Sequence, residues 1–415
     1  MLVSLNIKNY RSAKNEIELS LVAAKRKEVE KNFVFNTNYE ALLDAAVVYG
    51  PNASGKTTVI QAMSVTKELI KRSFKDQNAL EELIKPFLFD EKTKDEPSEF
   101  DIIFIVDGVR YQYGFTATKK IIYSEWLYSF PKGRIQTLFT RDFNYKTDEY
   151  SYNFGRNYRG EKSSAKFLTP KNSLFLSVVS RTKNHESAIP VLQWFNQLNV
   201  IGINGVNDLL TALGISDKKL DKLEVTNFLK NADINVADLD VREIKFNTTK
   251  IPANTPQLIK ESMVEAFKDL ETFEVDIVHM VKNKNYVLPI EEESSGTRRM
   301  FGYAGVIIKT LKEGGVLFID ELNNHLHPLM VEYILKKFNS PIDNPKQAQI
   351  VFSTHDVTIL NLLRRDQVWF CDRDEELSTN LTSLLEYKAR DGDNFERSYL
   401  SGRYGAIPIL NIWPE

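Results

Sequence analysis

The alternation of apolar and polar residues predicts β-strands in the first part of the chain. Apolar residues alternate with polar ones at residues 3–7, and an apolar run occupies residues 46–49. Two β-rich runs between Phe100 and Phe115 flank Asp107-Gly108, a dipeptide that favours a two-residue hairpin turn. A helix is expected at residues 57–72, and further strands at residues 122–130 and 136–140.

The pattern changes near residue 144. Polar residues, Asn, Ser and Gly crowd residues 144–173, and helical periodicity follows. Residues 259–270 predict an amphipathic helix whose apolar face holds Ile259, Met263, Ala266, Phe267 and Leu270. A weaker helical pattern spans residues 217–230, and strand-like sequence returns at residues 272–279 and 286–290.

The last third of the chain alternates between helix and strand. A helix is expected at residues 300–311 and another at 328–339, with strands at 315–319 and 349–353 and then a further helix and strand. This alternation is typical of α/β proteins with a parallel sheet. We therefore expect an α/β fold divided into regions 1–144, 145–285, 286–390 and 391–415.

Composition excludes several classes of protein. The chain has 415 residues and 42% hydrophobic residues, enough for a sizeable core. The net charge of −2 predicts no global attraction to nucleic acid or to an anionic membrane. The single cysteine, Cys371, excludes an intramolecular disulfide and a cysteine metal cluster. Since neither a signal peptide nor a membrane span is expected, we expect a cytoplasmic protein.

The stretch VVYGPNASGKTT, residues 47–58, fits the phosphate-binding pattern G-x-x-x-x-G-K-[ST] at every fixed position. It follows an apolar strand and opens a predicted helix. Glycines let the backbone approach phosphates, and a helix N-terminus adds partial positive charge. A glycine-rich turn without a ligand is the alternative. We expect nucleotide binding by Gly50, Asn52, Ala53, Ser54, Gly55, Lys56, Thr57 and Thr58, with Lys56 on the phosphates and Thr57 on Mg²⁺.

Two apolar strands of the last third end in residues suited to phosphate chemistry. GGVLFIDEL, residues 314–322, ends in Asp320, which would hold Mg²⁺, and Glu321, which would deprotonate the attacking water. IVFSTHD, residues 350–356, places His355 after a strand. Because ligands of open α/β sheets bind at the carboxyl edge, neighbouring strands would bring His355 to the γ-phosphate. A structural histidine is the alternative.

A small polar loop, EESSGTRRM at residues 292–300, precedes the predicted helix at 300–311. Ser295 and Gly296 offer a hydroxyl and backbone N–H groups, the groups of an anion-binding helix start. A plain helix N-cap is the alternative.

The order of these motifs resembles that of ABC-type ATPases. SSGTR, residues 294–298, corresponds to the ABC signature, with Ser295, Gly296 and Thr297. LNIKNYRS near the start and DELNNHLHP after the acidic strand are similar to the SMC, RecF and OLD branch. The chain most resembles AAA/ABC ATPases of bacterial phage-defence and abortive-infection loci, of the RloA and AbiL type. That resemblance includes an aromatic hairpin at Gly108–Phe115 and YLSGRYGAIP at Tyr399–Pro408.

The resemblance implies an ABC-type P-loop ATPase head with a parallel-sheet core, an antiparallel β subdomain and a mainly helical insertion. Regions 1–144 and 286–390 would be the halves of the head, 145–285 the insertion and 391–415 a C-terminal tail. In such ATPases the signature loop of one subunit completes the site of another. Ser295, Gly296 and Thr297 would therefore act in trans on ATP and Mg²⁺ in a homodimer or higher oligomer, which ATP closes and hydrolysis opens.

The resemblance also implies an ATPase that senses or scaffolds for a separate effector, a nuclease or toxin, in anti-phage defence. The chain has no second catalytic centre recognisable from sequence, which agrees with a separate effector. Two alternatives stay open: a RecF- or SMC-like DNA-repair ATPase that clamps DNA, and a nucleotide-binding interaction module with little hydrolysis. The second is suggested by Thr297 and Arg298, which depart from the usual signature. Gln77 and Gln112 both fit the glutamine loop of the family poorly.

Three further features allow a functional and a structural interpretation. The stretch 156–183 is basic and could contact nucleic acid or a partner, or form a solvated loop. Its only acidic residue is Glu161, and its basic residues are Arg156, Arg159, Lys162, Lys166, Lys171, Arg181 and Lys183. His325 and His327 could bind a metal or shape a loop at the dimer contact. Tyr10 and Arg11 could contact the nucleotide base or α-phosphate.

Overall fold

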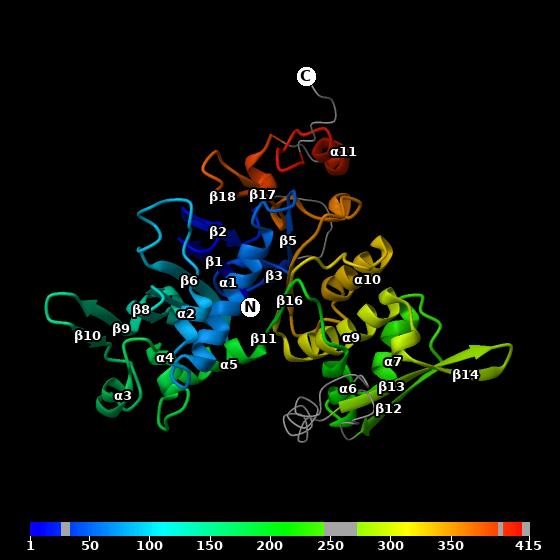
Figure 1. Ribbon diagram of the computed structural model, residues 1–415, viewed down its shortest axis with the longest axis horizontal. Helices are drawn as coiled ribbons and strands as arrows, with labels where there is room; N and C mark the ends of the chain where they lie inside the picture. The colour runs from blue at the N-terminus through cyan, green and yellow to red at the C-terminus, as the bar shows by residue number, and fades with distance from the viewer. Residues whose placement is uncertain (26–33, 245–271, 389–392, 409–415) are drawn as a thin grey trace, which may run out of the picture. The chain divides into compact units, whose positions relative to one another are not determined.

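A computed structural model describes residues 1–25, 34–244, 272–388 and 393–408 (Figure 1). The helix predicted at 259–270 lies outside these residues. The chain divides into two compact units. The first comprises Met1–Asn204, Thr310–Asn323 and Ile334–Glu415, and the second comprises Gly205–Lys309 and Asn324–Tyr333.

A six-stranded sheet of the first unit carries the phosphate-binding motifs. Its order is β11 (Leu198–Ile201), β15 (Val316–Ile319), β16 (Gln349–Ser353), β5 (Ala45–Tyr49), β17 (Val368–Arg373) and β18 (Thr379–Ser383). The first five strands are parallel, and β18 is antiparallel to β17. Every residue of β5, β15 and β16 is buried, as parallel strands covered on both faces require. The strands predicted at 46–49, 315–319 and 349–353 are confirmed.

Helix α1 (Lys56–Arg72) follows β5 and packs against this sheet at β11, β15 and β16. Its buried side chains include Val59, Ile60, Met63 and Leu69. Because β16 lies between β15 and β5 and all three are parallel, their carboxyl ends meet at one edge. Three segments that are far apart in sequence therefore end side by side.

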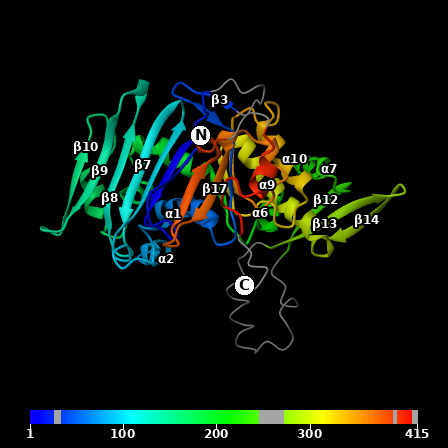
Figure 2. The same cartoon turned by 90° about the horizontal axis from the view of Figure 1, so that it is seen from above.

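A seven-stranded antiparallel sheet forms the rest of the β structure in the first unit, apart from a small hairpin, β3 (Val34–Asn36) with β4 (Ala41–Leu43). Its order is β10 (Glu149–Phe154), β9 (Gln136–Asn144), β8 (Ile122–Ser129), β7 (Val109–Ala117), β6 (Ser98–Val106), β1 (Leu2–Lys8) and β2 (Ile17–Ser20), and Figure 2 shows β7 to β10 side by side. Asp107 and Gly108 have φ of 49° and 70°, which confirms the predicted two-residue turn between β6 and β7.

One face of the antiparallel sheet belongs to the hydrophobic core, and the other is largely polar. Phe100, Phe104 and Phe115 are fully buried in the core cluster. Strand β10 falls in the polar stretch 144–173, and its register against β9 pairs Glu149 with Asn144. In β10 the aromatic residues Tyr150, Tyr152 and Phe154 alternate with polar ones, as is typical of a strand. Because the flanking residues are polar, the sequence did not predict this strand.

The remaining elements of the first unit are short. They are α2 (Ala79–Leu83), α3 (Ser163–Leu168), α4 (Phe175–Val179), α5 (Ile189–Gln197), α11 (Phe395–Leu400) and single 3₁₀ turns. The helix expected after residue 353 is not formed. Two 3₁₀ turns, Leu360–Leu362 and Arg365–Gln367, connect β16 to β17 instead. Arg364 and Gln367 form a capping box there, which satisfies the backbone over a span too short for an α-helix.

The second unit contains a three-stranded antiparallel sheet of β12 (Asp238–Ile244), β13 (Thr272–Val281) and β14 (Lys284–Pro289). Helix α6 (Asp208–Ser216) contacts β12 and β13, and α7 (Lys222–Asn231) contacts β12. Asp221 caps α7 by accepting the N–H of Leu223, so this helix begins later than the predicted residue 217. Helices α9 (Ser295–Glu313) and α10 (Pro328–Asn339) begin in this unit and end in the first.

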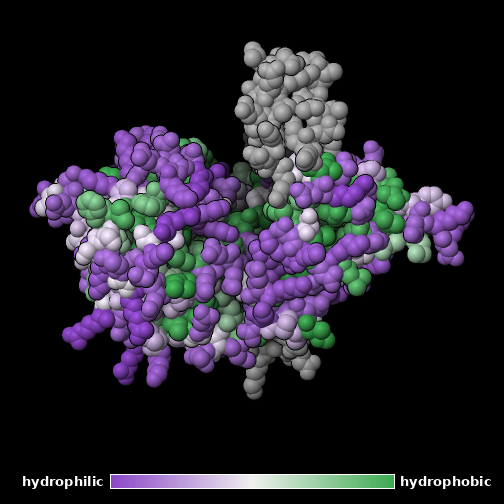
Figure 3. Space-filling model, turned by 90° about the horizontal axis from the view of Figure 1, so that it is seen from below, coloured by the Kyte–Doolittle hydropathy of each residue, from purple (hydrophilic) through white to green (hydrophobic). Residues whose placement is uncertain are grey.

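The two units do not follow the regions proposed from sequence. Strands β9 and β10 pair across residue 144, and β11 is a strand of the parallel sheet, so residues 145–204 belong to the first unit. The described part of region 145–285 contains strands as well as helices. None of the described helices combines the length and the apolarity needed to cross a bilayer. Hydrophilic residues predominate on the face drawn in Figure 3, with apolar areas between them.

Candidate nucleotide site

The predicted phosphate loop connects β5 to α1. Gly55 is the N-cap of α1 with φ of 110°, a conformation that favours glycine, and a Cβ there would lie 2.0 Å from Thr379 Oγ1. A Cβ on Gly50 would lie 2.2 Å from the carbonyl oxygen of Cys371. Neither position can carry a side chain without a shift of β17 or β18. Asn52 and Ala53 are exposed at the tip of the loop, and Ala53 also has positive φ, 64°.

Side chains outside the phosphate-binding pattern, from Ser12, Cys371 and Thr379, hold this loop through hydrogen bonds. The carbonyl of Ser54 accepts hydrogen bonds from Thr379 Oγ1 at 2.9 Å and from Cys371 Sγ at 3.3 Å. Ser12 Oγ lies 2.8 Å from Thr379 Oγ1 and 2.7 Å from Thr58 Oγ1. The N–H of Thr58 donates to the carbonyl of Gly55 at 2.8 Å. Thr58 is therefore engaged in anchoring the loop, and burial raises the pKa of the Cys371 thiol to about 12, which keeps it neutral.

Lys56 is the first residue of α1, and its side chain folds back over the phosphate loop. Its Nζ donates to the carbonyls of Gly50 at 2.8 Å and Pro51 at 2.9 Å, and only 5% of the residue is exposed. Burial lowers the pKa of this ammonium, while the negative charges of Glu321 and Asp320 oppose the shift. The carboxylates after β15 are thus close enough to act electrostatically on the lysine.

Asp320 and Glu321 follow β15 and are held by one residue of β16, Ser353. Ser353 Oγ donates to Asp320 Oδ1 at 2.6 Å and accepts the N–H of Glu321 at 2.8 Å. Asp320 is 2% exposed, and its Oδ2 is buried without a hydrogen-bond partner among the described residues. Glu321 has φ of 53°, a left-handed conformation that is uncommon outside glycine and concentrates at functional sites.

His355 lies beside Glu321, with 3.8 Å between His355 Nε2 and Glu321 Oε1. Burial lowers the pKa of His355, the positive charge of Lys56 lowers it further, and Glu321 and Asp320 oppose the shift. Asn323 holds the segment, since its Oδ1 accepts Thr354 Oγ1 at 2.9 Å and the N–H of His355 at 3.4 Å. His355 follows β16, which pairs with β15, so the expected neighbouring position of these two strands is confirmed.

The residues at this edge fit a nucleotide with a divalent cation. Asp320 Oδ2 and Ser54 Oγ are both buried polar atoms without partners in the described chain, which is costly unless a ligand or water satisfies them. Carboxylate and hydroxyl oxygens are ligands that Mg²⁺ prefers, and Mg²⁺ in such sites is completed by substrate phosphates. Among the described residues, no group of three or more His, Cys, Asp or Glu side chains could hold a metal alone.

The signature-like loop lies in the second unit, at the start of α9. Ser294 Oγ accepts the N–H of Thr297 at 3.1 Å and lies 2.9 Å from Thr297 Oγ1, so Ser294 caps the helix. Ser295 is exposed, and a Cβ on Gly296 would lie 3.2 Å from the carbonyl of His325. The Ser295 hydroxyl, at this helix N-terminus, forms no hydrogen bond with the described residues.

Other residues singled out from sequence have mainly structural surroundings. Tyr10 is 1% exposed and packs edge-on against Phe100, with 5.0 Å between ring centroids, so it cannot contact a nucleotide base. His327 Nδ1 accepts the N–H of Leu329 at the start of α10. Lys162 and Lys166 lie over aromatic rings of β10, and Lys171 is paired with Asp148 at 2.6 Å. Gln112 is bonded to Asp101 in the antiparallel sheet.

Residues 45–361 match a family model described as "AAA domain, putative AbiEii toxin, Type IV TA system". No curated protein matches the chain. Among solved structures, the chain is similar to the SMC head domain from Thermotoga maritima, at 13% identity over 92% of this chain and 98% of that chain, with a TM-score of 0.43. It is also similar to the recombination mediator protein RecF-ATPrS in the RecFOR pathway, at 13% identity over 92% and 98% of the two chains, with a TM-score of 0.38.

A phosphate loop, an Asp-Glu strand end and a strand-end histidine share one edge of a parallel sheet, and an antiparallel sheet completes the unit. This arrangement agrees with the expected ABC-type P-loop ATPase head. The family match covers most of the chain, from β5 to the turn after His355. The chain therefore belongs to the ATPase family described as "AAA domain, putative AbiEii toxin, Type IV TA system".

Proposed function

We propose that this chain binds and hydrolyses ATP with Mg²⁺ in a homodimer or higher oligomer and, through this cycle, regulates a separate effector, a nuclease or toxin, in anti-phage defence. The observation that carries the proposal is the buried, partnerless Oδ2 of Asp320 at the edge where Lys56 and Glu321 also lie. An isolated buried carboxylate oxygen would be unfavourable, but a cation would satisfy it.

Each side chain has a distinct role in this proposal. Lys56 would exchange its bonds to the loop carbonyls for bonds to the β- and γ-phosphates. Asp320 Oδ2 and the Thr57 hydroxyl would hold Mg²⁺, whose charge stabilises the phosphates. Glu321 would accept the proton of the attacking water, and His355 would donate to the γ-phosphate. Ser353 keeps Asp320 and Glu321 in register, because its hydroxyl contacts both.

The dimer part of the proposal rests on the start of α9. Ser295 is exposed beside a capped helix N-terminus, and Gly296 and Thr297 follow it. Such an end presents N–H groups and partial positive charge to an anion. We propose that Ser295, Gly296 and Thr297 reach the γ-phosphate bound by a second copy, as in the family that the sequence resembles.

Mixing two inactive variants tests this arrangement. Lys56→Ala and Ser295→Arg should each abolish turnover alone. In a two-fold heterodimer, one site carries both substitutions and the other site carries neither. Half of the dimers in an equal mixture are heterodimers, and half of their sites are intact. The mixture should therefore recover about a quarter of the wild-type rate. Ser294→Arg is not a suitable control because Ser294 caps α9, whereas Lys312→Ala, near the end of the same helix, should leave the rate unchanged. A mixture that stays inactive, with both variants folded and oligomeric, would refute action in trans.

The defence role draws on the family description, which names a toxin of a toxin–antitoxin system. The resemblance to RloA- and AbiL-type proteins points the same way. Expression of the chain with its neighbouring reading frames should reduce phage plaque counts, and Lys56→Ala should abolish that protection. Steep, salt-sensitive stimulation of turnover by DNA without any effect on phage would instead favour a DNA-repair ATPase.

A further inference from the structure

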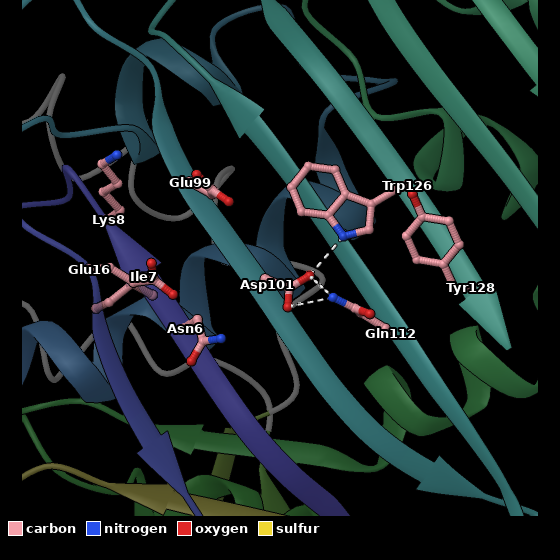
Figure 4. Close-up of a pocket in the computed structure, with 9 residues that line it drawn as sticks. All are labelled: Asn6, Ile7, Lys8, Glu16, Glu99, Asp101, Gln112, Trp126 and Tyr128. Atoms are coloured by element: carbon pink, nitrogen blue, oxygen red, sulfur yellow. Dashed lines mark hydrogen bonds between the residues drawn. The ribbon is translucent and has the colours of Figure 1, made fainter. Parts of the chain in front are cut away.

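The open face of the antiparallel sheet contains a hollow of about 280 Å³ (Figure 4). It is separate from the nucleotide edge, because its lining comes from β1, β6, β7 and β8 and from the residue before β2. The lining residues are Asn6, Ile7, Lys8, Glu16, Glu99, Asp101, Gln112, Trp126 and Tyr128. This volume is below the range of sites for drug-sized molecules and suits one side chain.

The floor of the hollow is a built arrangement across three strands. The register places Asp101 of β6, Gly114 of β7 and Trp126 of β8 in one row. The indole lies across Gly114, where a Cβ would come within 2.3 Å of Trp126 Cζ2. Because Gly114 of β7 has no side chain, the indole of Trp126 extends from β8 across β7 to β6. The indole Nε1–H then donates to Asp101 Oδ1 at 2.7 Å. Figure 4 shows the ring beside the carboxylate.

Asp101 accepts hydrogen bonds from two side chains and is only 8% exposed. Gln112 Nε2 donates to its two oxygens at 3.0 and 2.9 Å, in addition to the Trp126 bond. These hydrogen bonds oppose the effect of burial, which raises the pKa of Asp101. The floor therefore combines a fixed carboxylate with an aromatic ring.

The rim of the hollow is acidic. Glu16 is exposed and Glu99 half-buried, and neither forms an ion pair with the described residues. Lys8 faces Glu99 in the strand register, but no contact within ion-pair distance joins them. Burial raises the pKa of Glu99, and Glu16 and Asp101 add to this effect, whereas Lys8 opposes it. Three carboxylates against one ammonium leave the hollow negative, and a ligand that relieves their repulsion must be positive.

The shape of the site selects among cations. The carboxylates do not converge as a metal site would require, since no group of three metal-binding side chains is found among the described residues. A flat, weakly hydrated cation satisfies both the aromatic floor and the separated carboxylates, because a guanidinium stacks on an indole and donates in several directions in its plane. A lysine ammonium is a compact point charge and cannot stack on the indole in this way.

We propose that this hollow is a docking site for an arginine side chain of a partner protein, with the guanidinium over Trp126 and directed toward the acidic rim of Glu99 and Glu16. This interaction surface goes beyond the ATPase cycle and does not depend on it. Charge complementarity supports the choice of a basic partner, and the negative rim disfavours nucleic acid.

Titration of the whole protein with the peptide acetyl-Gly-Arg-Gly-amide tests the proposal. The indole N–H signal of Trp126, assigned by its loss in Trp126→Phe, should shift with saturation. Glu16→Gln and Glu99→Gln should each weaken binding by about two- to fivefold, the range of exposed ion pairs. Glu149→Gln on β10, outside the hollow, is the matched control and should change nothing. ATP turnover should be unaffected by all three substitutions, which verifies folding and separates this test from that of the ATPase.

Two matched peptides decide the chemistry. The citrulline peptide has the same shape without the charge and should bind about fivefold more weakly or worse. The lysine peptide should also bind more weakly than the arginine peptide. The proposal would be overturned if the citrulline and arginine peptides bound equally well, or if both glutamate variants kept the wild-type affinity. It would also be overturned if the Trp126 signal responded to Mg²⁺ or Ca²⁺ but to no peptide.

Discussion

The two large sheets of the first unit build their sites in different ways. In the parallel sheet, residues that follow β5, β15 and β16 gather at one edge because all three strands point the same way. In the antiparallel sheet, the hollow is built in mid-strand, from side chains that face one another across β1, β6, β7 and β8. One site is made by strand ends and the other by cross-strand register.

This difference decides how each site is encoded. A strand-end site needs several neighbouring residues of one loop, so it leaves short motifs such as GPNASGKT. A cross-strand site takes only one to three residues from each strand, and those residues lie within ordinary alternating sequence. The first kind tolerates little change in the loop, while the second depends on exact pairing of strands.

Removing the phosphate-loop lysine should have the largest effect. Lys56→Ala deletes the ammonium beside the carboxylates of the strand-end site, so ATP binding should be lost and turnover should fall by about 10³-fold. Binding of a fluorescent ATP analogue measures the loss. Lys71→Ala, near the exposed end of the same helix, should behave as wild type. Retained ATP binding in Lys56→Ala would show that the loop cradles phosphate without its lysine.

Changing the expected base should separate binding from chemistry at this edge. Glu321→Gln keeps the backbone hydrogen bond to Ser353 and removes the proton acceptor, so kcat should fall by about 10²–10⁴-fold while ATP still binds. Light scattering after size-exclusion chromatography should then detect an ATP-dependent dimer. Turnover at the parental rate would contradict the role assigned to Glu321.

The pKa of His355 should report the charges of the strand-end site. It should lie below the ordinary 6.5 because burial and Lys56 disfavour the imidazolium. Lys56→Ala should raise it, and Glu321→Gln should lower it further, as NMR titration would measure. Because the unfolded chain binds this proton more readily, His355 should reduce stability as the pH falls below about 6.5. If the pKa of His355 moved in the opposite direction in these two variants, the imidazole would not lie beside Lys56 and Glu321.

A substitution in the cross-strand site should have the smallest effect on activity. Gly114→Ala forces Trp126 off the middle strand and breaks its bond to Asp101, so the free energy of unfolding should fall by about 1–3 kcal/mol with ATP turnover unchanged. Denaturant titration measures the change. Gly202→Ala is the matched control, since a Cβ there meets nothing within 4 Å. Equal stability of the two variants would mean that the indole does not need Gly114.

The sequence predicted that these strand ends meet at one edge of the sheet, but it did not predict the side chains that hold them there. Lys56, Asp320, Glu321 and His355 stand in motifs whose spacing is set by a strand and the turn after it. Ser12, Thr379 and Ser353 hold those motifs, yet each contributes a single hydroxyl to which no pattern assigned a role. Ser353, in the stretch IVFSTHD, could have been suspected because it ends a strand beside His355. Ser12 ends the stretch LNIKNYRS, but no pattern connects its hydroxyl with the phosphate loop, and none indicates Thr379.

Local interactions explain what the sequence by itself determined: the phosphate loop with α1, the Asp107-Gly108 hairpin, and the buried strands β5, β15 and β16. Each depends on residues within one turn or one strand. Only the tertiary structure decided that β11 joins the parallel sheet, that β10 extends the antiparallel one, and that Trp126 meets Asp101 across Gly114. These outcomes depend on strand pairing between distant segments, and the alternation of side chains along one strand does not specify its neighbour.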